Sequence, residues 1–137
     1  GIIAIKIKSD RMLLAYGFLR SVFEIFERYK TPIDMITTSE VAVSLTIDND
    51  AALDKIVTEI QQFASIEIDN NQSIICIVGD FTGDKKGYAV KVFDSLKEIP
   101  IRMISYGGSN HNISILVSSE YKKEALMALN KGLFNYN

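Results

Sequence analysis

The sequence contains two related halves, and this internal repeat limits what the chain can fold into. Three stretches of the first half return in the same order in the second. They are residues 17–19 with 87–89, 33–37 with 101–105, and 43–45 with 113–115. A unit of about 70 residues is longer than the repeats of solenoid proteins and long enough for a small α+β module. We therefore predict two tandem domains, residues 1–70 and residues 71–137.

The composition is that of a folded chain with no bias toward nucleic acid or membrane. Of its 137 residues, 47% are hydrophobic, which is ample for a core, and the formal net charge is −2. No apolar run approaches the roughly 18 residues that span a bilayer, and no signal peptide is visible. The single cysteine, Cys76, excludes an internal disulfide. These features fit a cytoplasmic protein that has neither a nucleic-acid nor a membrane partner.

Hydrophobic periodicity predicts the same order of elements in both halves. In the first domain we expect strands at 2–8, 33–37, 41–47 and 65–69, with helices at 17–29 and 52–63, the second helix capped by residues 48–50. In the second domain we expect strands at 73–79, 101–106 and 111–117, with helices at 87–97 and 119–131. Asn70 and Asn71 would form the turn between the domains.

This order is the βαββαβ pattern of ferredoxin-like folds. The predicted class is α+β, with antiparallel sheets that carry helices on one face. The second domain is one strand short, which leaves an open sheet edge.

No catalytic or metal-binding pattern is present in the sequence. His111 is the only histidine and Cys76 has no companion, whereas a metal site needs several ligands. Ser109 lies near His111, but the surrounding residues match no nucleophile signature. We therefore expect no catalytic residue and no metal, and interpret the chain as a sensor.

Two polar features of the first domain have complementary charge preferences. Gly17 precedes a helix whose free N–H groups favour a carboxylate, although the glycine could simply ease entry into the helix. Asp34, Thr38, Ser39 and Glu40 could hold an ammonium, although they could equally be solvated residues that cap a turn. Together the two features match the two charged groups of a free amino acid.

Three motifs resemble the regulatory ACT domains of aspartate kinase. Residues 34–46 resemble the first ACT domain of the monofunctional, lysine-sensitive enzyme, and residues 17–23 resemble the start of its first helix. Residues 101–113 are similar to the second ACT domain. The motifs occur in the family's order and the likeness covers essentially the whole chain.

The resemblance implies a function that spacing alone does not. Aspartate kinase phosphorylates aspartate with ATP, the first step toward lysine, threonine and methionine. Its kinase domain, which uses ATP and Mg, is absent here, so we expect a non-catalytic C-terminal regulatory fragment without a cofactor. In the family, lysine binds the first ACT domain near a homodimer interface and causes feedback inhibition. The missing strand of the second domain comes from sequence just before the first.

The resemblance also implies a set of effector-binding residues. By matching positions, these are Met12, Gly17, Phe18, Leu19, Ile33, Asp34, Thr38, Ser39 and Glu40. The backbone at Gly17, Phe18 and Leu19 would receive the carboxylate, and either Asp34 or Glu40 would hold an amino group. Ala15 and Pro32 depart from the family pattern, which bears on affinity. The alternative is a structural dimerisation module that binds no effector.

Overall fold

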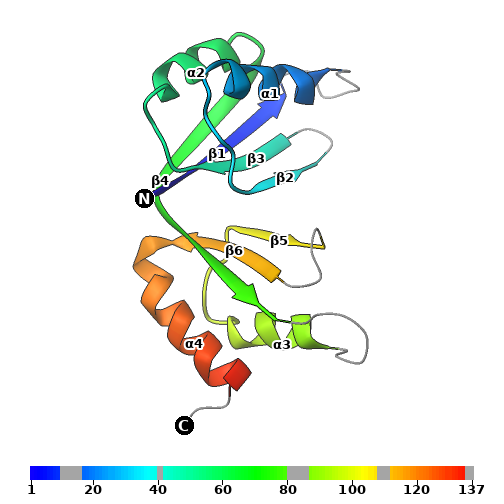
Figure 1. The fold of residues 1–137 in the computed structure, drawn as a ribbon, viewed down its shortest axis with the longest axis vertical. Coiled ribbons are helices and arrows are strands. Elements are labelled where there is room, and N and C mark those ends of the chain that lie inside the picture. The colour runs from blue at the N-terminus through cyan, green and yellow to red at the C-terminus, as the bar shows by residue number, and fades with distance from the viewer. Residues whose placement is uncertain (10–16, 40–41, 80–86, 108–111, 135–137) are drawn as a thin grey trace. The chain divides into compact units, whose positions relative to one another are not determined.

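The computed structural model describes residues 1–9, 17–39, 42–79, 87–107 and 112–134 of the chain (Figure 1). The chain divides into two compact units, Gly1–Asn71 and Gln72–Asn137. The sequence placed the boundary after residue 70, one residue earlier. Met12, Ala15, Glu40, Ser109 and His111 lie outside the described residues.

The first unit is a four-stranded sheet with two helices on one face (Figure 1). The strands lie in the order β2-β3-β1-β4. The elements are β1 (Ile2–Ser9), α1 (Phe18–Arg28), β2 (Ile36–Thr38), β3 (Ala42–Ile47), α2 (Leu53–Ile60) and the first half of β4 (Ala64–Val78). The α+β class and the ferredoxin-like element order predicted from the sequence are confirmed.

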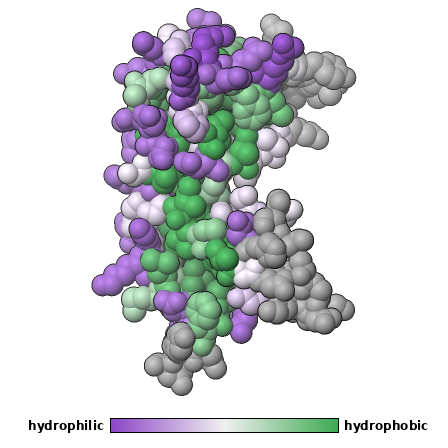
Figure 2. All heavy atoms as spheres, viewed as in Figure 1, coloured by the Kyte–Doolittle hydropathy of each residue, from purple (hydrophilic) through white to green (hydrophobic). Residues whose placement is uncertain are grey.

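Side-chain alternation along β1 determines which face of this sheet carries the helices. Ile5 and Ile7 are buried in the core, whereas Lys6 and Lys8 are exposed on the opposite face. Antiparallel pairing with β3 continues the same division, because Ile5 lies opposite Leu45, which is also buried. The apolar stripe of α1 (Val22, Ile25 and Phe26) packs into this core. Hydrophilic residues cover the outer side of the helices (Figure 2).

The second unit repeats this plan over the described residues with three strands instead of four. The strands lie in the order β4-β6-β5. The elements are the second half of β4, α3 (Tyr88–Ser95), β5 (Met103–Tyr106), β6 (Asn112–Ser118), a short 3₁₀ turn η1 (Ser119–Tyr121) and α4 (Lys122–Phe134). A separate core contains Val92, Ile113, Ile115 and Leu129.

The turn predicted at Asn70 and Asn71 is wrong. β4 runs without interruption from Ala64 to Val78 and supplies a strand to each unit. Asn71 has a positive φ of 57°, which asparagine tolerates better than most residues. The sequence signal was therefore a local backbone irregularity within a strand and not a chain reversal.

Two boundaries in the first unit also differ from the prediction. β2 begins at Ile36, so residues 33–35 lead into the strand instead of forming part of it. At α2 the N-cap residue is Ala52, with no side-chain cap. The Asn49 Oδ1 atom accepts a hydrogen bond from the Ala51 N–H at 2.9 Å, which forms a turn just before the helix.

Among the described residues, no helix has both the length and the hydrophobicity needed to cross a membrane.

Candidate functional site

The N-terminus of α1 presents backbone N–H groups that lack acceptors within the helix. Gly17 adopts a left-handed conformation with φ of 85°, and its carbonyl accepts the first helical hydrogen bond from the Ser21 N–H at 2.8 Å. The preceding amides of the first turn, at Phe18 and Leu19, have no acceptor among the described residues. No acidic side chain occupies this turn and Gly17 provides no side-chain cap. An anion is therefore the natural partner of this helix end.

The β2–β3 corner lies at the same end of the first unit. Thr38 pairs with Val43, and the Ser39 N–H donates to the Ala42 carbonyl at 2.9 Å. Ala42 in turn lies opposite Lys8 near the end of β1, from which the chain leads toward α1. The structure therefore places Thr38 and Ser39 at the edge of the sheet nearest the start of α1 (Figure 1).

Asp34 lies at the opposite end of β2. Its N–H donates to the Thr46 carbonyl at 2.9 Å, which extends the β2–β3 pairing beyond Ile36. The rise of an extended chain puts Asp34 about 13 Å from Thr38. Asp34 is thus separated along the strand from Thr38 and Ser39. Ile33, the residue before Asp34, packs half-buried against the core.

Electrostatics distinguish Asp34 from an ordinary solvated carboxylate. Desolvation is the main cause that raises the pKa of Asp34, and the nearby Asp48 carboxylate raises it further. The side chain nevertheless stays exposed. A cation arriving beside these two carboxylates would relieve their repulsion.

The second unit shows that the fold does not require this acid pair. Arg102 occupies the place of Asp34, since its N–H donates to the Leu116 carbonyl at 2.8 Å in the equivalent bond. Ser118 stands at the position of Asp48 in the repeat. The two units thus share a backbone arrangement but reverse the charge at this point. The carboxylates of the first unit are an addition to the fold.

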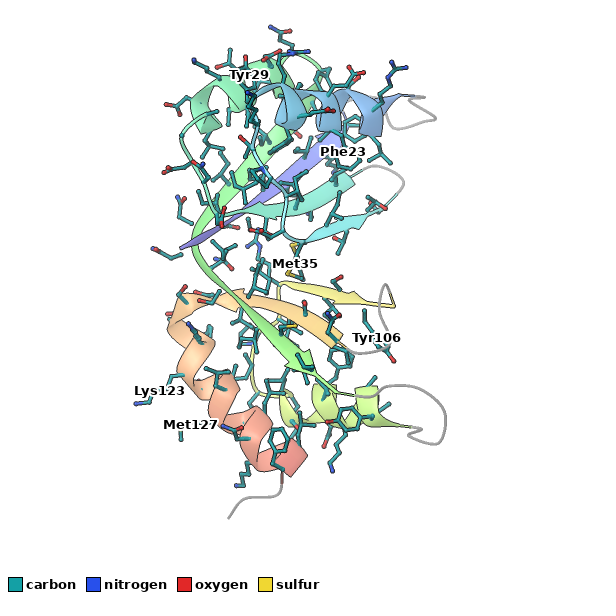
Figure 3. All side chains as sticks on the ribbon, viewed as in Figure 1. Phe23, Tyr29, Met35, Tyr106, Lys123 and Met127 are labelled. Carbon is teal, nitrogen blue, oxygen red and sulfur yellow. The ribbon has the colours of Figure 1, made fainter. Side chains whose placement is uncertain are left out.

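A second charged cluster lies between the other end of α1 and α2. Arg28 forms an ion pair with Glu59, and Tyr29, which is labelled in Figure 3, lies beside the same carboxylate. The Glu59 side chain is the largest cause that raises the pKa of Tyr29, and the Tyr29 hydroxyl is the largest cause that lowers the pKa of Glu59. The cluster joins two helices, and we interpret it as structural.

Sequence reasoning missed a polar hollow on the face of the sheet that carries no helix. The hollow has a volume of about 320 Å³ and is lined by Lys6, Lys8, Thr37, Thr38, Ser39, Ala42 and Ser44. Its signal in the sequence was the alternation of lysines with buried isoleucines in β1. Over the described residues, no group of histidine, cysteine or acidic side chains could hold a metal ion.

Comparison with known proteins agrees with this architecture. Residues 75–133 match the family model described as ACT domain. A solved structure assigned as a C-terminal regulatory domain of aspartate kinase, from Porphyromonas gingivalis W83, is 50% identical with a TM-score of 0.89. The match covers 98% of this chain and 93% of that one. The chain belongs to the family of aspartate kinase regulatory domains.

Longer relatives of this regulatory domain are whole aspartokinases. The aspartokinase of Schizosaccharomyces pombe is 36% identical over 96% of the chain, and the lysine-sensitive aspartokinase 3 of Escherichia coli is 34% identical over 92%. The chain spans 26% and 30% of their respective lengths. A crystal structure of E. coli aspartokinase III in complex with lysine and aspartate matches with a TM-score of 0.84, 33% identity, and coverage of 97% of this chain and 31% of that one.

Proposed function

We propose that this regulatory domain binds a free amino acid, lysine foremost, and conveys feedback inhibition to an aspartate kinase, which phosphorylates aspartate with ATP. The observation that carries the proposal is the pair of opposite charge preferences in the first unit. The amides at Phe18 and Leu19 favour a carboxylate, and Asp34 with Asp48 favours an ammonium. The lysine complex of E. coli aspartokinase III, a relative over nearly the whole chain, supports the choice of ligand.

The separation of these two groups indicates how the effector would be held. Bond lengths of about 1.5 Å give an extended lysine roughly 7 Å between its side-chain nitrogen and its carboxylate carbon. That length is about half of the ~13 Å of extended chain between Asp34 and Thr38, and Thr38 lies at the end of the sheet nearest the start of α1. This mismatch favours a site whose two charged groups come from different copies of the unit.

A homodimer would resolve this mismatch, because a second copy could supply the missing group. One first unit would contribute the start of α1, and the other would contribute Asp34. Ile36, 38% exposed on the outermost strand β2, provides an apolar edge for such pairing. Lysine would then stabilise one arrangement of two copies, which is a shift of population between states.

Thermal melts combined with sedimentation test this proposal. We expect lysine at millimolar concentration to raise the melting temperature and to favour the dimer, because a ligand that binds only the folded state stabilises it by mass action. Threonine and methionine serve as comparison ligands, since both contain the α-amino acid group but lack the second ammonium. A melting temperature that lysine leaves unchanged would refute effector binding.

The second candidate function is dimerisation without an effector. The exposed Ile36 on edge strand β2 favours it, since an apolar sheet edge can pair with another copy whether or not a ligand is present. It predicts a stable dimer whose melting temperature ignores all three amino acids. The same melts therefore separate the two functions.

A further inference from the structure

We infer that the polar hollow on the helix-free face of the first unit is a binding site for a small oxyanion, a phosphate or carboxylate group. Its walls come from three neighbouring strands, β1, β2 and β3. Two lysines and four hydroxyl-bearing residues line its volume of about 320 Å³. These six residues are Lys6, Lys8, Thr37, Thr38, Ser39 and Ser44. Lys6, Lys8, Thr37 and Ser44 project from the helix-free face, whereas Thr38 lies opposite the buried Val43 and lines the hollow from the end of β2.

Strand register brings the donors together. Lys6 lies opposite Ser44, and Ser44 lies opposite Thr37 on its other side, so these three residues form one row across the sheet. Lys8 is two residues along β1 and therefore projects from the same face, about 7 Å from Lys6. Their ammonium and hydroxyl groups therefore project from one face of the sheet into the same hollow.

These donors are not engaged elsewhere in the part of the chain that the structure describes. Neither Lys6 nor Lys8 forms an ion pair there, and the hydroxyls of Thr37 and Ser44 form no hydrogen bond. The described lining contains no carboxylate that could neutralise the lysines. An oxyanion would receive charge-assisted hydrogen bonds from the lysines and neutral ones from the hydroxyls, which is the usual chemistry of phosphate and carboxylate recognition.

The second unit provides a comparison within the same chain. At the register positions of Lys6 and Lys8 it has Cys76, opposite Ser114, and Val78, opposite Asn112. Both replacements are exposed and neither is charged. The fold therefore builds this part of the sheet without lysine, so folding does not explain the two lysines of the first unit.

The two lysines of the hollow lie on the face of the sheet opposite to the helices. The core side of β1, with Ile5 and Ile7, faces the helices, whereas Lys6 and Lys8 face away from them. The sheet itself thus lies between the hollow and the start of α1. Thr38 and Ser39, which the family resemblance assigns to the effector, contribute to the lining of the hollow. The proposal therefore rests on Lys6, Lys8, Thr37 and Ser44, which the effector proposal does not use.

Amide chemical shifts of the isotopically labelled chain measure this binding. Inorganic phosphate and succinate are titrated separately at constant ionic strength, with sodium chloride as the reference titration. We expect saturable shifts at Thr37 and Ser44 with phosphate, succinate or both, and the stronger of the two arms identifies the anion class. Shifts equal to those in chloride would overturn the proposal, because they would show general screening of charge.

Matched charge variants test the assignment to the two lysines. Lys6→Gln and Lys8→Gln should each weaken anion binding roughly tenfold, the loss of one charge-assisted contact. Lys8→Val, which copies the residue of the second unit, should behave like Lys8→Gln while keeping a β-branched strand residue. Lys55→Gln, on the exposed side of α2, is the control and should bind as the parent does.

The lysine-induced rise in melting temperature should persist in the Lys6 and Lys8 variants. This result separates a failure of the anion site from a failure of the effector proposal. Unchanged anion affinity in all three hollow variants would refute the site.

Discussion

Replacing Asp34 with asparagine should change stability and effector binding in opposite directions. The substitution keeps the shape of the side chain and its backbone hydrogen bond to Thr46, but it removes the charge. The pKa of Asp34 is raised in the folded chain, so the ionised carboxylate is less favourable there than in the unfolded chain. The stability that the protonated Asp34 side chain contributes is complete below its pKa in the unfolded chain. This contribution is lost as the pH rises through its pKa in the folded chain. At pH 7 the charge therefore costs stability, and asparagine removes that cost.

The two effects differ in size. Because Asp34 is exposed and solvent screens its repulsion with Asp48, the gain in unfolding free energy should be small, at most about 0.5 kcal/mol. The loss of an ammonium–carboxylate contact should weaken lysine binding by roughly 1.5–2 kcal/mol, the lower part of the range for hydrogen bonds to charged groups. This corresponds to about 10- to 30-fold in the dissociation constant.

Thermal melts with and without lysine, together with calorimetric titration, measure both effects on one sample. We expect Asp34→Asn to melt at or slightly above the parent temperature without ligand and to show a smaller shift with lysine. Glu27→Gln, which removes an exposed carboxylate from α1, is the control and should keep the full lysine shift. If Asp34→Asn lowered the melting temperature without ligand and bound lysine normally, Asp34 would be a structural residue and the reasoning would be refuted.

Three further predictions follow from the same structure. Lysine binding should weaken on acidification as Asp34 takes up a proton, and the raised pKa places this loss at a higher pH than for an ordinary aspartate. Calorimetric titrations over a pH series measure this, and an affinity that does not change with pH would contradict it. Gly17→Ala should cost about 1 kcal/mol of unfolding free energy, because alanine disfavours a φ of 85°, and urea denaturation measures it. Gly132→Ala should cost about 1–3 kcal/mol in the same assay, since the added Cβ atom would lie 1.9 Å from the Oγ atom and 2.6 Å from the Cβ atom of Ser95. Wild-type stability of the Gly17 variant would contradict the backbone argument, and wild-type stability of the Gly132 variant would contradict the packing argument.

The sequence allowed most of the fold to be predicted because hydrophobic periodicity reports directly on burial. In α1, the residues spaced three and four apart are the ones that reach the core, and β1 alternates isoleucine with lysine as a strand with one buried face must. Periodicity does not report on chain reversal. The asparagines at 70 and 71 have the composition of a turn, yet the chain continues as a strand because the pairing of β4 in both units outweighs the local preference.

The candidate site was harder to predict than the fold, for a geometric reason. Residues 34–40 are neighbours in sequence, and four of them (Asp34, Thr38, Ser39 and Glu40) were interpreted together as a site for an ammonium. An extended strand separates residues by about 3.3 Å each, so sequence neighbours in β2 reach opposite ends of the sheet. The hollow around Lys6 was missed for the complementary reason. Its members come from three strands, and only the register of β1, β2 and β3 brings them together.

The repeat itself separates what folding requires from what binding requires. Both units begin their first helix with a left-handed glycine, Gly17 with φ of 85° and Gly87 with φ of 80°, and neither supplies a side-chain cap. A free helix N-terminus is therefore a property of the fold and by itself distinguishes neither unit as a sensor. What differs is the charge at equivalent positions, because Asp34 of the first unit corresponds to Arg102 of the second. The second unit keeps the same backbone hydrogen bond with a side chain of opposite charge, so ligand preference can change at these positions without loss of the fold. Differences in effector choice among such domains should therefore concentrate at these positions.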